Sequence, residues 1–594
     1  MTTVPDPTNP FNLAHGGGAP SPGSYGTVML TALVRLHHAL QGVRLPLDLP
    51  GIEEQRAGLK EMLDQLGDYV IPRVTTLEAP LLTVVGGSTG AGKSTLVNSL
   101  VGRKVTQPGL LRPTTRSPVL VHHPDDASWF GAERLLPDLE RVDHPTTDPE
   151  ALQLVAADSV PAGLAILDAP DVDSVVEKNR ELAAQLLAAA DLWLFVTSAA
   201  RYADQVPWEF LKQAAERSTA VAIVLDRTPE DAVQTVATHL ARMLASRGLK
   251  DSPLFVVHEG PVSEDGLLPA EYVAEIRGWL ESLAGDVAAK QNVVIQTLDG
   301  AVRTLTRRTY PIADAAAEQM GVADRLRVDA VDSYDEGVHR VVAAMEDGTL
   351  LRGEVLARWQ EFVGTGELLK GLESRVGRLR DRLVNTVKGK PHQAERITVA
   401  VESGLEMLIL EHAEASAERA ETAWNQLLAG QGLLRDAGTE LGRASRELRR
   451  NAERSVREWQ SDVLEMVRTQ GQDKRTTARF LAFGVNGLSV ALMIVVFSYS
   501  YGLTGAEVGI AGGSAVLGQK LLEAVFGDQA VRSLAERARK ALELRVRELF
   551  AAEQARFTDL VDGLGFDPET PEQLRRASRR VEDARYAGQR GDSS

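Results

Sequence analysis

Short apolar runs separated by amphipathic segments fill residues 79–285. Each run has four to six mostly aliphatic or aromatic residues, as buried strands do, and the segments between them have helical spacing. The runs cover residues 81–85, 118–121, 164–167, 192–196, 220–225 and 254–257. This alternation predicts an α/β domain with a doubly wound, mostly parallel sheet.

The pattern changes after about residue 286. Apolar positions now recur three and four residues apart, as at Leu326, Ala330 and Tyr334, and strand-like runs are absent up to residue 479. This spacing places apolar side chains on one face of a helix. We therefore predict a long α-helical, coiled-coil-like stalk over residues 286–479 and a returning stalk helix over residues 528–580.

The two ends of the chain differ from these parts. Residues 1–26 are rich in Pro and Gly and contain neither the basic start nor the apolar run of a signal peptide, so we expect a disordered tail. Residues 27–78 have amphipathic helical spacing and are expected to form N-terminal neck helices. Residues 581–594 are expected to form a second disordered tail.

One segment, residues 480–527, is far more apolar than the rest of the chain. Its first 27 residues, 480–506, contain no charged side chain, and about 20 apolar residues suffice for a helix to cross a bilayer. Basic residues flank both ends, at Lys474, Arg475, Arg479, Arg532, Arg537, Arg539 and Lys540. Basic clusters on one side match a transmembrane hairpin with cytoplasmic ends.

Two other interpretations of this segment stay open. The second arm, residues 508–526, contains Lys520 and Glu523, which suits a paddle inserted into one leaflet better than a full span. The third interpretation is a helical hairpin buried inside a soluble bundle, which the long uncharged run disfavours. Between the first two we favour a membrane-spanning hairpin slightly, because the first arm alone is long enough.

The net charge and the absence of cysteine exclude several classes of partner and chemistry. The chain has 594 residues and a formal charge of −17, which argues against a broad nucleic-acid surface because phosphate binding needs concentrated Lys and Arg. The absence of cysteine excludes disulfides, Cys-ligated zinc and a thiol nucleophile, and it fits a reducing cytoplasm. We therefore expect no nucleic-acid partner.

A phosphate-binding motif follows the first apolar run. Its residues are Gly87, Ser88, Thr89, Gly90, Ala91, Gly92, Lys93 and Ser94, which fit G-x-x-x-x-G-K-[ST], and Thr95 continues into a predicted helix. The glycines allow backbone N–H groups to point at phosphates, Lys93 supplies a charge to the β- and γ-phosphates, and the Ser94 hydroxyl is a magnesium ligand. We predict a nucleoside triphosphate and Mg²⁺ as cofactors.

This motif and its continuation, VVGGSTGAGKSTLVNSLVG, resemble the P-loop of Era/TrmE-like and dynamin-like GTPases. The resemblance covers residues 79 to about 260 by motif. It implies that a threonine in RPTTRSP (residues 112–118) belongs to the first switch and binds magnesium. Thr115 is our first choice for this metal ligand, with a catalytic role beside Lys93, and Thr114 is the second.

The resemblance also assigns the strand end LAILDAPD (residues 164–171) to the D-x-x-G motif. Asp168 is then a magnesium ligand through water, and Asp171 replaces the family glycine. Thr89 and Gly90 stand where dynamins and potassium-dependent Era-like members place the glutamine or asparagine that orients water. The resemblance therefore supports nucleotide binding more strongly than fast hydrolysis.

The base-recognition motif also departs from the family pattern. Asp226, Arg227, Thr228 and Pro229 stand where the resemblance places N/T-K-x-D, and Pro229 cannot pair with the guanine edge as the family aspartate does. Asp226 or Asp231 are candidate substitutes, and Arg227 can stack on the base. GTP is expected, with ATP as the alternative.

The order of these parts is similar to that of a bacterial dynamin-like protein. The resemblance implies a P-loop GTPase domain followed by a helical stalk with an apolar membrane hairpin, at the cytoplasmic face of the cell membrane. It implies membrane remodelling or events at the division septum, driven by G-domain dimerisation, in a homo- or hetero-oligomer with a related dynamin. The alternative is a nearly inactive nucleotide-binding scaffold that partners an active paralogue. A ribosome-binding Era-like factor is disfavoured by the acidic charge.

Overall fold

The computed structural model describes residues 22–106, 117–131, 136, 139–146, 148–174, 177–216, 219–347, 350, 354–363, 391–438, 440–471, 485–497 and 511–591. The chain divides into two compact units. Unit 1 comprises residues 1–45, 51–317 and 567–594, and unit 2 comprises residues 46–50 and 318–566. Each unit is described by itself.

Unit 1 is built around a sheet that has eight strands within the described residues. The strands are β1 (Leu81–Gly87), β2 (Val119–His122), β3 (Glu140–Val142), β4 (Ala151–Ala156), β5 (Leu164–Asp168), β6 (Leu192–Ser198), β7 (Ala220–Thr228) and β8 (Leu254–His258). Their order is β3-β4-β2-β5-β1-β6-β7-β8. The central strands β1, β5 and β6 are buried along their whole length, as expected for a sheet covered by helices on both faces.

The predicted parallel sheet is confirmed with one exception. β2 pairs in parallel with β4 but antiparallel with β5, so that Val119 lies opposite Asp168. The six predicted apolar runs all correspond to strands, whereas β3 and β4 were not predicted. β3 has three residues at the edge of the sheet and is partly exposed, so it carries no apolar run. In β4 the burial decreases along the strand, from Ala151 to Ala156.

Helices of unit 1 connect or precede these strands. Those of the α/β part are α4 (Lys93–Val101), α5 (Glu177–Ala188), α6 (Gln205–Glu216), α7 (Val233–Ser246) and α8 (Ala270–Gly285), with the short 3₁₀ segment η2 (Pro124–Phe130). A buried cluster ties the sheet to the preceding helices. Arg73 donates to Asp191 at 2.9 Å, and Tyr69 donates to the same carboxylate at 3.0 Å. Asp191 also accepts the backbone N–H of Leu82 in β1 at 2.8 Å.

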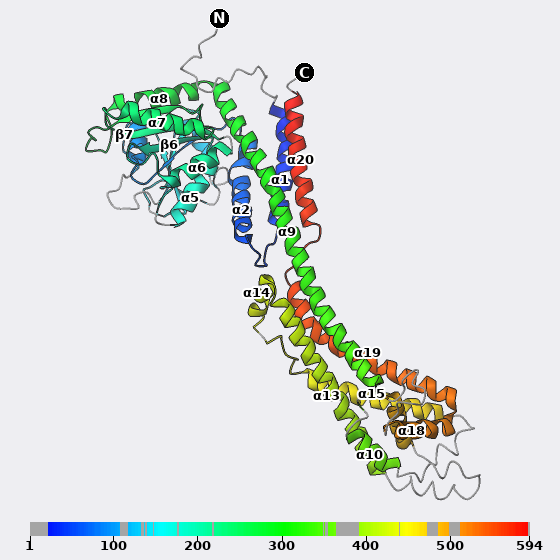
Figure 1. The fold of residues 1–594 in the computed structure, drawn as a ribbon. Helices are drawn as coiled ribbons and strands as arrows, with labels where there is room; N and C mark the ends of the chain where they lie inside the picture. The colour runs from blue at the N-terminus through cyan, green and yellow to red at the C-terminus, as the bar shows by residue number, and fades with distance from the viewer. Residues whose placement is uncertain are drawn as a thin grey trace, which may run out of the picture. The chain divides into compact units, whose positions relative to one another are not determined.

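The remaining helices of unit 1 come from both ends of the chain. They are α1 (Pro22–Gln41), α2 (Ile52–Gln65), the π-helical turn η1 (Leu66–Val70), α3 (Ile71–Thr75), the first part of α9 (Val287–Glu346) and α20 (Thr570–Gly591). α1 and α20 lie side by side (Figure 1). Ser578 of α20 donates to the Thr306 carbonyl of α9 at 3.0 Å, and Arg575 pairs with Asp314 at 2.6 Å.

Described helices extend into both predicted tails. α1 begins at Pro22, within the predicted tail of residues 1–26, and α20 continues to Gly591, through most of the predicted tail of residues 581–594. The prediction for the second tail was wrong because its polar composition hides an amphipathic face. Val581 and Ala584 continue the buried face that Leu574 and Ala577 begin.

The regular secondary structure of unit 2 is all helical within its described residues. It contains the second part of α9, α10 (Glu354–Val363), α13 (Pro391–Trp424), α14 (Leu428–Asp436), α15 (Leu448–Gly471), α17 (Val485–Val496), α18 (Ala511–Phe526) and α19 (Asp528–Asp562). The predicted long helical stalk is thus present. Aromatic side chains fill its centre, where Tyr334 packs against Phe550 and Phe557 with ring centroids 6.3 and 6.1 Å apart.

The apolar segment is not a membrane hairpin among the residues that the structure describes. α17 packs against α13, α15, α18 and α19, and α18 packs against α10, α17 and α19. Every side chain from Leu488 to Phe497 is buried in the apolar core of unit 2. Across the described ranges, no helix is both long enough and apolar enough to span a membrane. The observed packing is that of the third interpretation, because neighbouring helices cover the uncharged surface.

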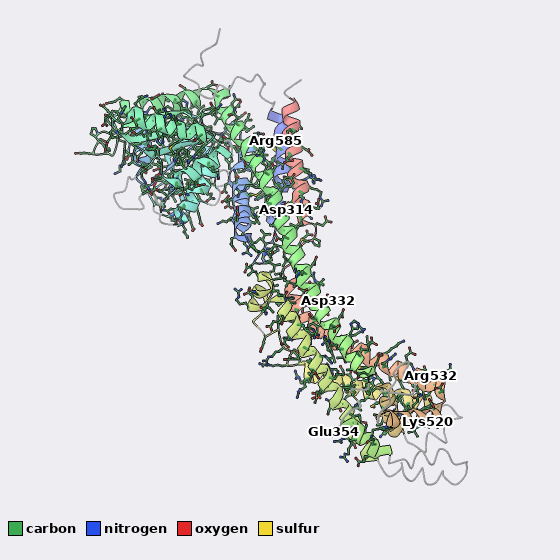
Figure 2. All side chains as sticks on the ribbon, in the orientation of Figure 1. Asp314, Asp332, Glu354, Lys520, Arg532 and Arg585 are labelled. Carbon is green, nitrogen blue, oxygen red and sulfur yellow. The ribbon has the colours of Figure 1, made fainter. Side chains whose placement is uncertain are left out.

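The charged residues of the second arm explain how α18 fits this bundle. Leu522 and Val525 are buried, whereas Lys520 is exposed, and Figure 2 shows Lys520 and Arg532 in the part of unit 2 formed by α18 and α19. Gly518 allows α18 to approach its neighbours closely, because a Cβ there would lie 3.2 Å from the ring of Trp359. α18 is therefore an amphipathic helix with one buried face.

Candidate functional site

The phosphate-binding loop joins the end of β1 to the start of α4. Gly87 has φ +147° and Gly92 has φ +99°. A Cβ on Gly87 would overlap the backbone carbonyl of Val196 in the neighbouring strand β6, and one on Gly92 would overlap the Asp226 carboxylate. Both positions thus require glycine, as the motif predicts.

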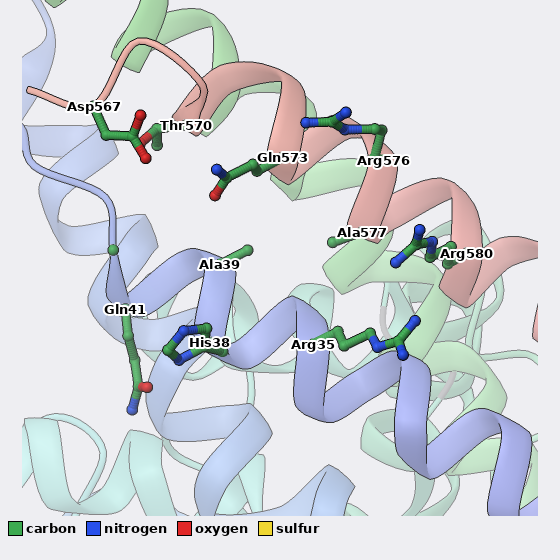
Figure 3. A pocket seen from close by; sticks show the side chains of 11 residues that line it. Arg35, His38, Ala39, Gln41, Asp567, Thr570, Gln573, Arg576, Ala577 and Arg580 are labelled. Atoms are coloured by element: carbon green, nitrogen blue, oxygen red, sulfur yellow. The ribbon is translucent and has the colours of Figure 1, made fainter.

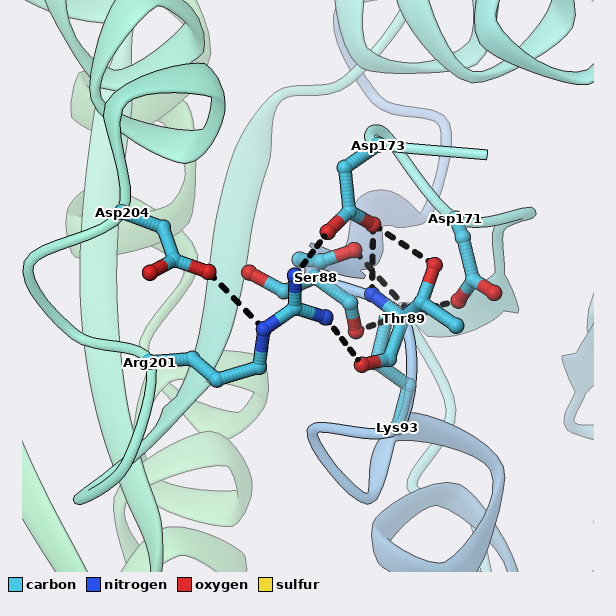
Figure 4. A network of polar contacts seen from close by, with 8 residues as sticks. Ser88, Thr89, Lys93, Asp171, Asp173, Arg201 and Asp204 are labelled. Atoms are coloured by element: carbon cyan, nitrogen blue, oxygen red, sulfur yellow. Dashed lines mark hydrogen bonds and ion pairs between the residues drawn. The ribbon is translucent and has the colours of Figure 1, made fainter. Parts of the chain in front are cut away.

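The loop lysine is buried and fully engaged. Lys93 Nζ donates to the carbonyls of Gly87 and Ser88, each at 3.0 Å, and forms a short ion pair with the Asp171 carboxylate (Figure 4). The side chains of Lys93 and Asp171 are each 4% exposed. Sequence analysis identified both residues but not their pairing, although the acidic run DAPDVD directly after a strand was a signal for it.

The structure brings together two of the three predicted magnesium ligands. Ser94 Oγ donates to Asp168 Oδ2 at 2.7 Å. Burial raises the pKa of Asp168 to about 6, although the hydrogen bond from Ser94 and the charge of Lys93 act in the opposite direction. The third predicted ligand, Thr115, and the alternative Thr114 lie outside the described residues.

The residues present fit a magnesium–phosphate group. Asp168 Oδ1 and Ser88 Oγ are buried and have no hydrogen-bond partner among the described residues. A buried polar atom without a partner is costly unless a ligand, ion or water satisfies it. Ser94 and Asp168 would hold the cation, and the N-terminus of α4 would face the phosphates.

A polar network fixes the outer part of the loop. The Thr89 N–H and hydroxyl both donate to Asp173 Oδ1, at 2.6 and 2.7 Å. Arg201, in the turn after β6, donates to the Thr89 carbonyl at 2.7 Å and pairs with Asp173 at 2.9 Å and Asp204 at 2.8 Å (Figure 4). Burial alone would raise the pKa of Asp173, but the two Thr89 donors and Arg201 hold that pKa below its ordinary value.

Sequence analysis missed Asp173 and Arg201. Their contacts join segments far apart in the chain, and no motif marks Arg201. The Thr89 hydroxyl donates its proton to Asp173 and so has no second proton to donate to a water.

The candidate base-recognition residues take an unexpected position. Asp226 is 2% exposed and lies against Gly92, and one of its oxygens accepts the Arg227 N–H at 2.8 Å. Arg227 has φ +49°, a left-handed conformation within β7, where the pairing with β8 is irregular between Leu225 and Thr228. The Asp226 carboxylate therefore lies against the phosphate-binding loop, and its pairing with guanine stays a prediction.

Replacing Asp226 by asparagine is expected to stabilise the nucleotide-free protein at neutral pH. Burial raises the pKa of the Asp226 carboxyl from 3.8 to about 6. Between these values the folded state keeps a proton that the unfolded chain has released, so stability falls as the pH rises through this window. The loss is at most about 3 kcal/mol at pH 7.

Urea unfolding at pH 4 and pH 7 tests this prediction. Asp226→Asn should lose less stability across the interval than the wild type does. A residual slope from Asp168, whose pKa is also about 6, should remain in both proteins. The prediction would be contradicted if the free energy of unfolding changed by the same amount between pH 4 and pH 7 in Asp226→Asn and in the wild type.

A second pocket lies away from the loop, between α1 and α20 (Figure 3). It has a volume of about 570 Å³, and Arg35, His38, Arg576 and Arg580 contribute basic groups to its lining. All four side chains are exposed, and Arg576 also pairs with Glu569 at 3.1 Å. This pocket has no motif and no buried charged group, so the phosphate-binding loop is the candidate site.

Comparisons with known proteins agree with this assignment. Residues 83–227 match the model of the dynamin family. A stretch of 161 residues is 25% identical to a probable transmembrane GTPase of Arabidopsis thaliana, described as FZO-like and chloroplastic. That stretch is 27% of this chain but only 16% of the plant protein. The phosphate-binding domain is thus similar to that of the dynamin family, over about a quarter of this chain.

Two solved structures align with most of the chain at low similarity. One is described as an oligomerised bacterial dynamin pair that provides a mechanism for long-range sensing and tethering of membranes. It is 11% identical with a TM-score of 0.43, over 94% of this chain and 95% of its own. Another is the LeoA bacterial dynamin GTPase from ETEC, which is 12% identical with a TM-score of 0.24, over 97% and 100% of the two chains.

Proposed function

We propose that this chain is a membrane-associated, dynamin-like GTP-binding protein that uses Mg²⁺. The observation that carries the proposal is the contact between Ser94 and Asp168, next to a buried Lys93, in a domain that matches the dynamin family. Lys93 binds the phosphates, and Ser94, Thr115 and Asp168 would hold the cation, which would help Lys93 to neutralise charge on the phosphoryl group during a slow hydrolysis.

Nucleotide titrations test this proposal. The purified full-length protein, with Mg²⁺, should bind GTP or GDP more tightly than ATP. The dynamin-family match supports a guanine base, while Pro229 removes the family aspartate that reads it. Equal binding of ATP and GTP would overturn guanine specificity, and the absence of binding to all three nucleotides would overturn the proposed site.

The alternative function is a nearly inactive nucleotide-binding scaffold. It is favoured by the engagement of Thr89 with Asp173 and of Lys93 with Asp171, which occupies two groups of the loop. Steady-state GTP hydrolysis, measured with and without liposomes, separates the two. Hydrolysis that liposomes accelerate supports the enzyme, whereas tight binding with negligible turnover in both conditions supports the scaffold.

We place the protein at the cytoplasmic face of the cell membrane, as a homo-oligomer or in a pair with a related dynamin-like protein. Membrane remodelling, at the division septum or elsewhere, is the proposed process. The support is the uncharged run of residues 480–506, part of which lies buried in α17. Because neighbouring helices cover α17, insertion into lipid requires this segment to leave the core of unit 2.

Flotation with liposomes tests the membrane proposal. The full-length protein should float with vesicles and resist a high-salt wash, because apolar contact is not screened by salt. Release by salt would indicate a purely electrostatic attachment. Absence of the protein from the floating fraction, with and without nucleotide, would overturn the proposal.

A further inference from the structure

The ammonium group of Lys93 has no donor left for a phosphate. A lysine ammonium has three hydrogen-bond donors. In this structure they go to the carbonyls of Gly87 and Ser88 and to the carboxylate of Asp171. A nucleotide that uses Lys93 must therefore replace one of these three partners.

Only one of the three partners is replaceable without dismantling the loop. The carbonyls of Gly87 and Ser88 belong to the loop backbone, and the Gly87 carbonyl also accepts the N–H of Val172 at 3.3 Å. Asp171 comes from a different segment, the turn after β5, and its side chain carries a full negative charge. Its carboxylate gives Lys93 a negatively charged hydrogen-bond acceptor, as a phosphate oxygen would.

We propose that Asp171 stands in for the γ-phosphate and makes this site prefer nucleoside diphosphates over triphosphates. The inference rests on the proposed nucleotide-binding function and specifies it. Backbone N–H groups of the loop cradle the inner phosphates, while the lysine reaches the β- and γ-phosphates. A diphosphate can occupy the loop while Asp171 remains paired with Lys93. The terminal oxygens of a triphosphate, in contrast, compete with Asp171 for the same ammonium group.

The turn that carries Asp171 is clamped to the loop. Asp173 accepts both donors of Thr89 and pairs with Arg201, which itself donates to the Thr89 carbonyl. The N–H of Val172 donates to the Gly87 carbonyl. The backbone of Asp171 therefore cannot move away from Lys93 unless its turn separates from Thr89. A triphosphate must therefore disrupt these contacts. It must also overcome the short-range repulsion between its terminal oxygens and the Asp171 carboxylate.

The measurement is the ratio of the dissociation constants of GTPγS and GDP, with Mg²⁺, for full-length proteins. The wild type should bind GDP more tightly than GTPγS. Asp171→Asn removes the charge and should strengthen GTPγS binding about tenfold or more while changing GDP binding less than about threefold. Asp143→Asn, at an exposed position of the same unit, changes the net charge equally and should leave both constants unchanged.

Two further variants keep the test decisive. Asp171→Glu retains the charge and should keep the GDP preference, whereas Asp171→Gly should relieve it even if the asparagine variant folds poorly. An unchanged ratio in both Asp171→Asn and Asp171→Gly, with GDP still bound, would overturn the role of Asp171 and leave the nucleotide site standing. Failure of every protein, wild type included, to bind either nucleotide would overturn the proposed function and this inference with it.

Discussion

Replacing Lys93 by alanine should abolish nucleotide binding and also lower the free energy of unfolding of unit 1 by about 3–5 kcal/mol. The first effect follows because the carbonyls of Gly87 and Ser88 lose the ammonium group that they contact, and with it the loop loses the conformation that presents its N–H groups to phosphates. The second arises because Asp171, which is 4% exposed, would be left as a buried carboxylate without its counter-ion. GDP titration and urea unfolding of the same full-length protein measure the two effects.

A double variant separates these effects. Lys93→Ala with Asp171→Asn should recover most of the lost stability, because no unpaired charge remains, but it should not recover nucleotide binding. Lys104→Ala, which removes an exposed lysine of the same unit, is the matched control and should behave as the wild type in both measurements. Equal instability of the single and double variants would show that the buried ion pair does not stabilise unit 1.

Trp459→Ala should have the largest effect in unit 2. The Trp459 side chain is fully buried, donates to the Ala538 carbonyl at 2.8 Å, and packs on Phe497 with ring centroids 5.7 Å apart. Its removal should cost about 3–5 kcal/mol of stability. Because Phe497 directly follows α17, the loss should also loosen the apolar segment and raise liposome binding several-fold in the flotation assay.

Trp424→Ala is the matched control. Trp424 is equally buried, donates to the Leu326 carbonyl at 2.9 Å, and packs on Phe557 rather than on the apolar segment. It should destabilise unit 2 by a similar amount without a comparable gain in liposome binding. If both variants gained binding equally, general loosening of the bundle and not the cover over α17 would be responsible.

Much of the fold of unit 1 was predictable because a strand buried on both faces has a local signature. The run 81–85 needs no knowledge of its neighbours to be recognised as a strand. β3 has no such signature, since its position at the sheet edge leaves it partly exposed. The antiparallel direction of β2 was also invisible, because side-chain alternation is the same in either direction.

The apolar segment shows a different limit of sequence reasoning. Residues 488–497 meet the same apolar surroundings in a protein core as in lipid, and their composition does not distinguish the two. The difference lies in the faces of α13, α15, α18 and α19 that cover α17, and the sequence of the run itself carries no information about them.

The candidate site was predictable where the motif is contiguous. Lys93 and Ser94 follow from the loop sequence, and Asp168 from the end of an apolar strand. The contact of Asp171 with Lys93 crosses 78 residues of chain, and that of Arg201 with Thr89 crosses 112. Such contacts depend on which strands are neighbours in the sheet, and side-chain charge alone does not define them.

The pairing of α1 with α20 has a consequence for how the protein is made. Leu33, Leu36 and Leu40 lie on the apolar face of α1 and are fully buried in unit 1. α20 belongs to the same unit. Residues 41 and 570, where these helices end and begin, are separated by more than 500 residues. At about 5–20 residues per second, the ribosome needs roughly half a minute or more to deliver α20. During synthesis, part of the apolar surface of α1 therefore stays exposed until α20 has been made. Such an exposed apolar surface is one that a chaperone can bind.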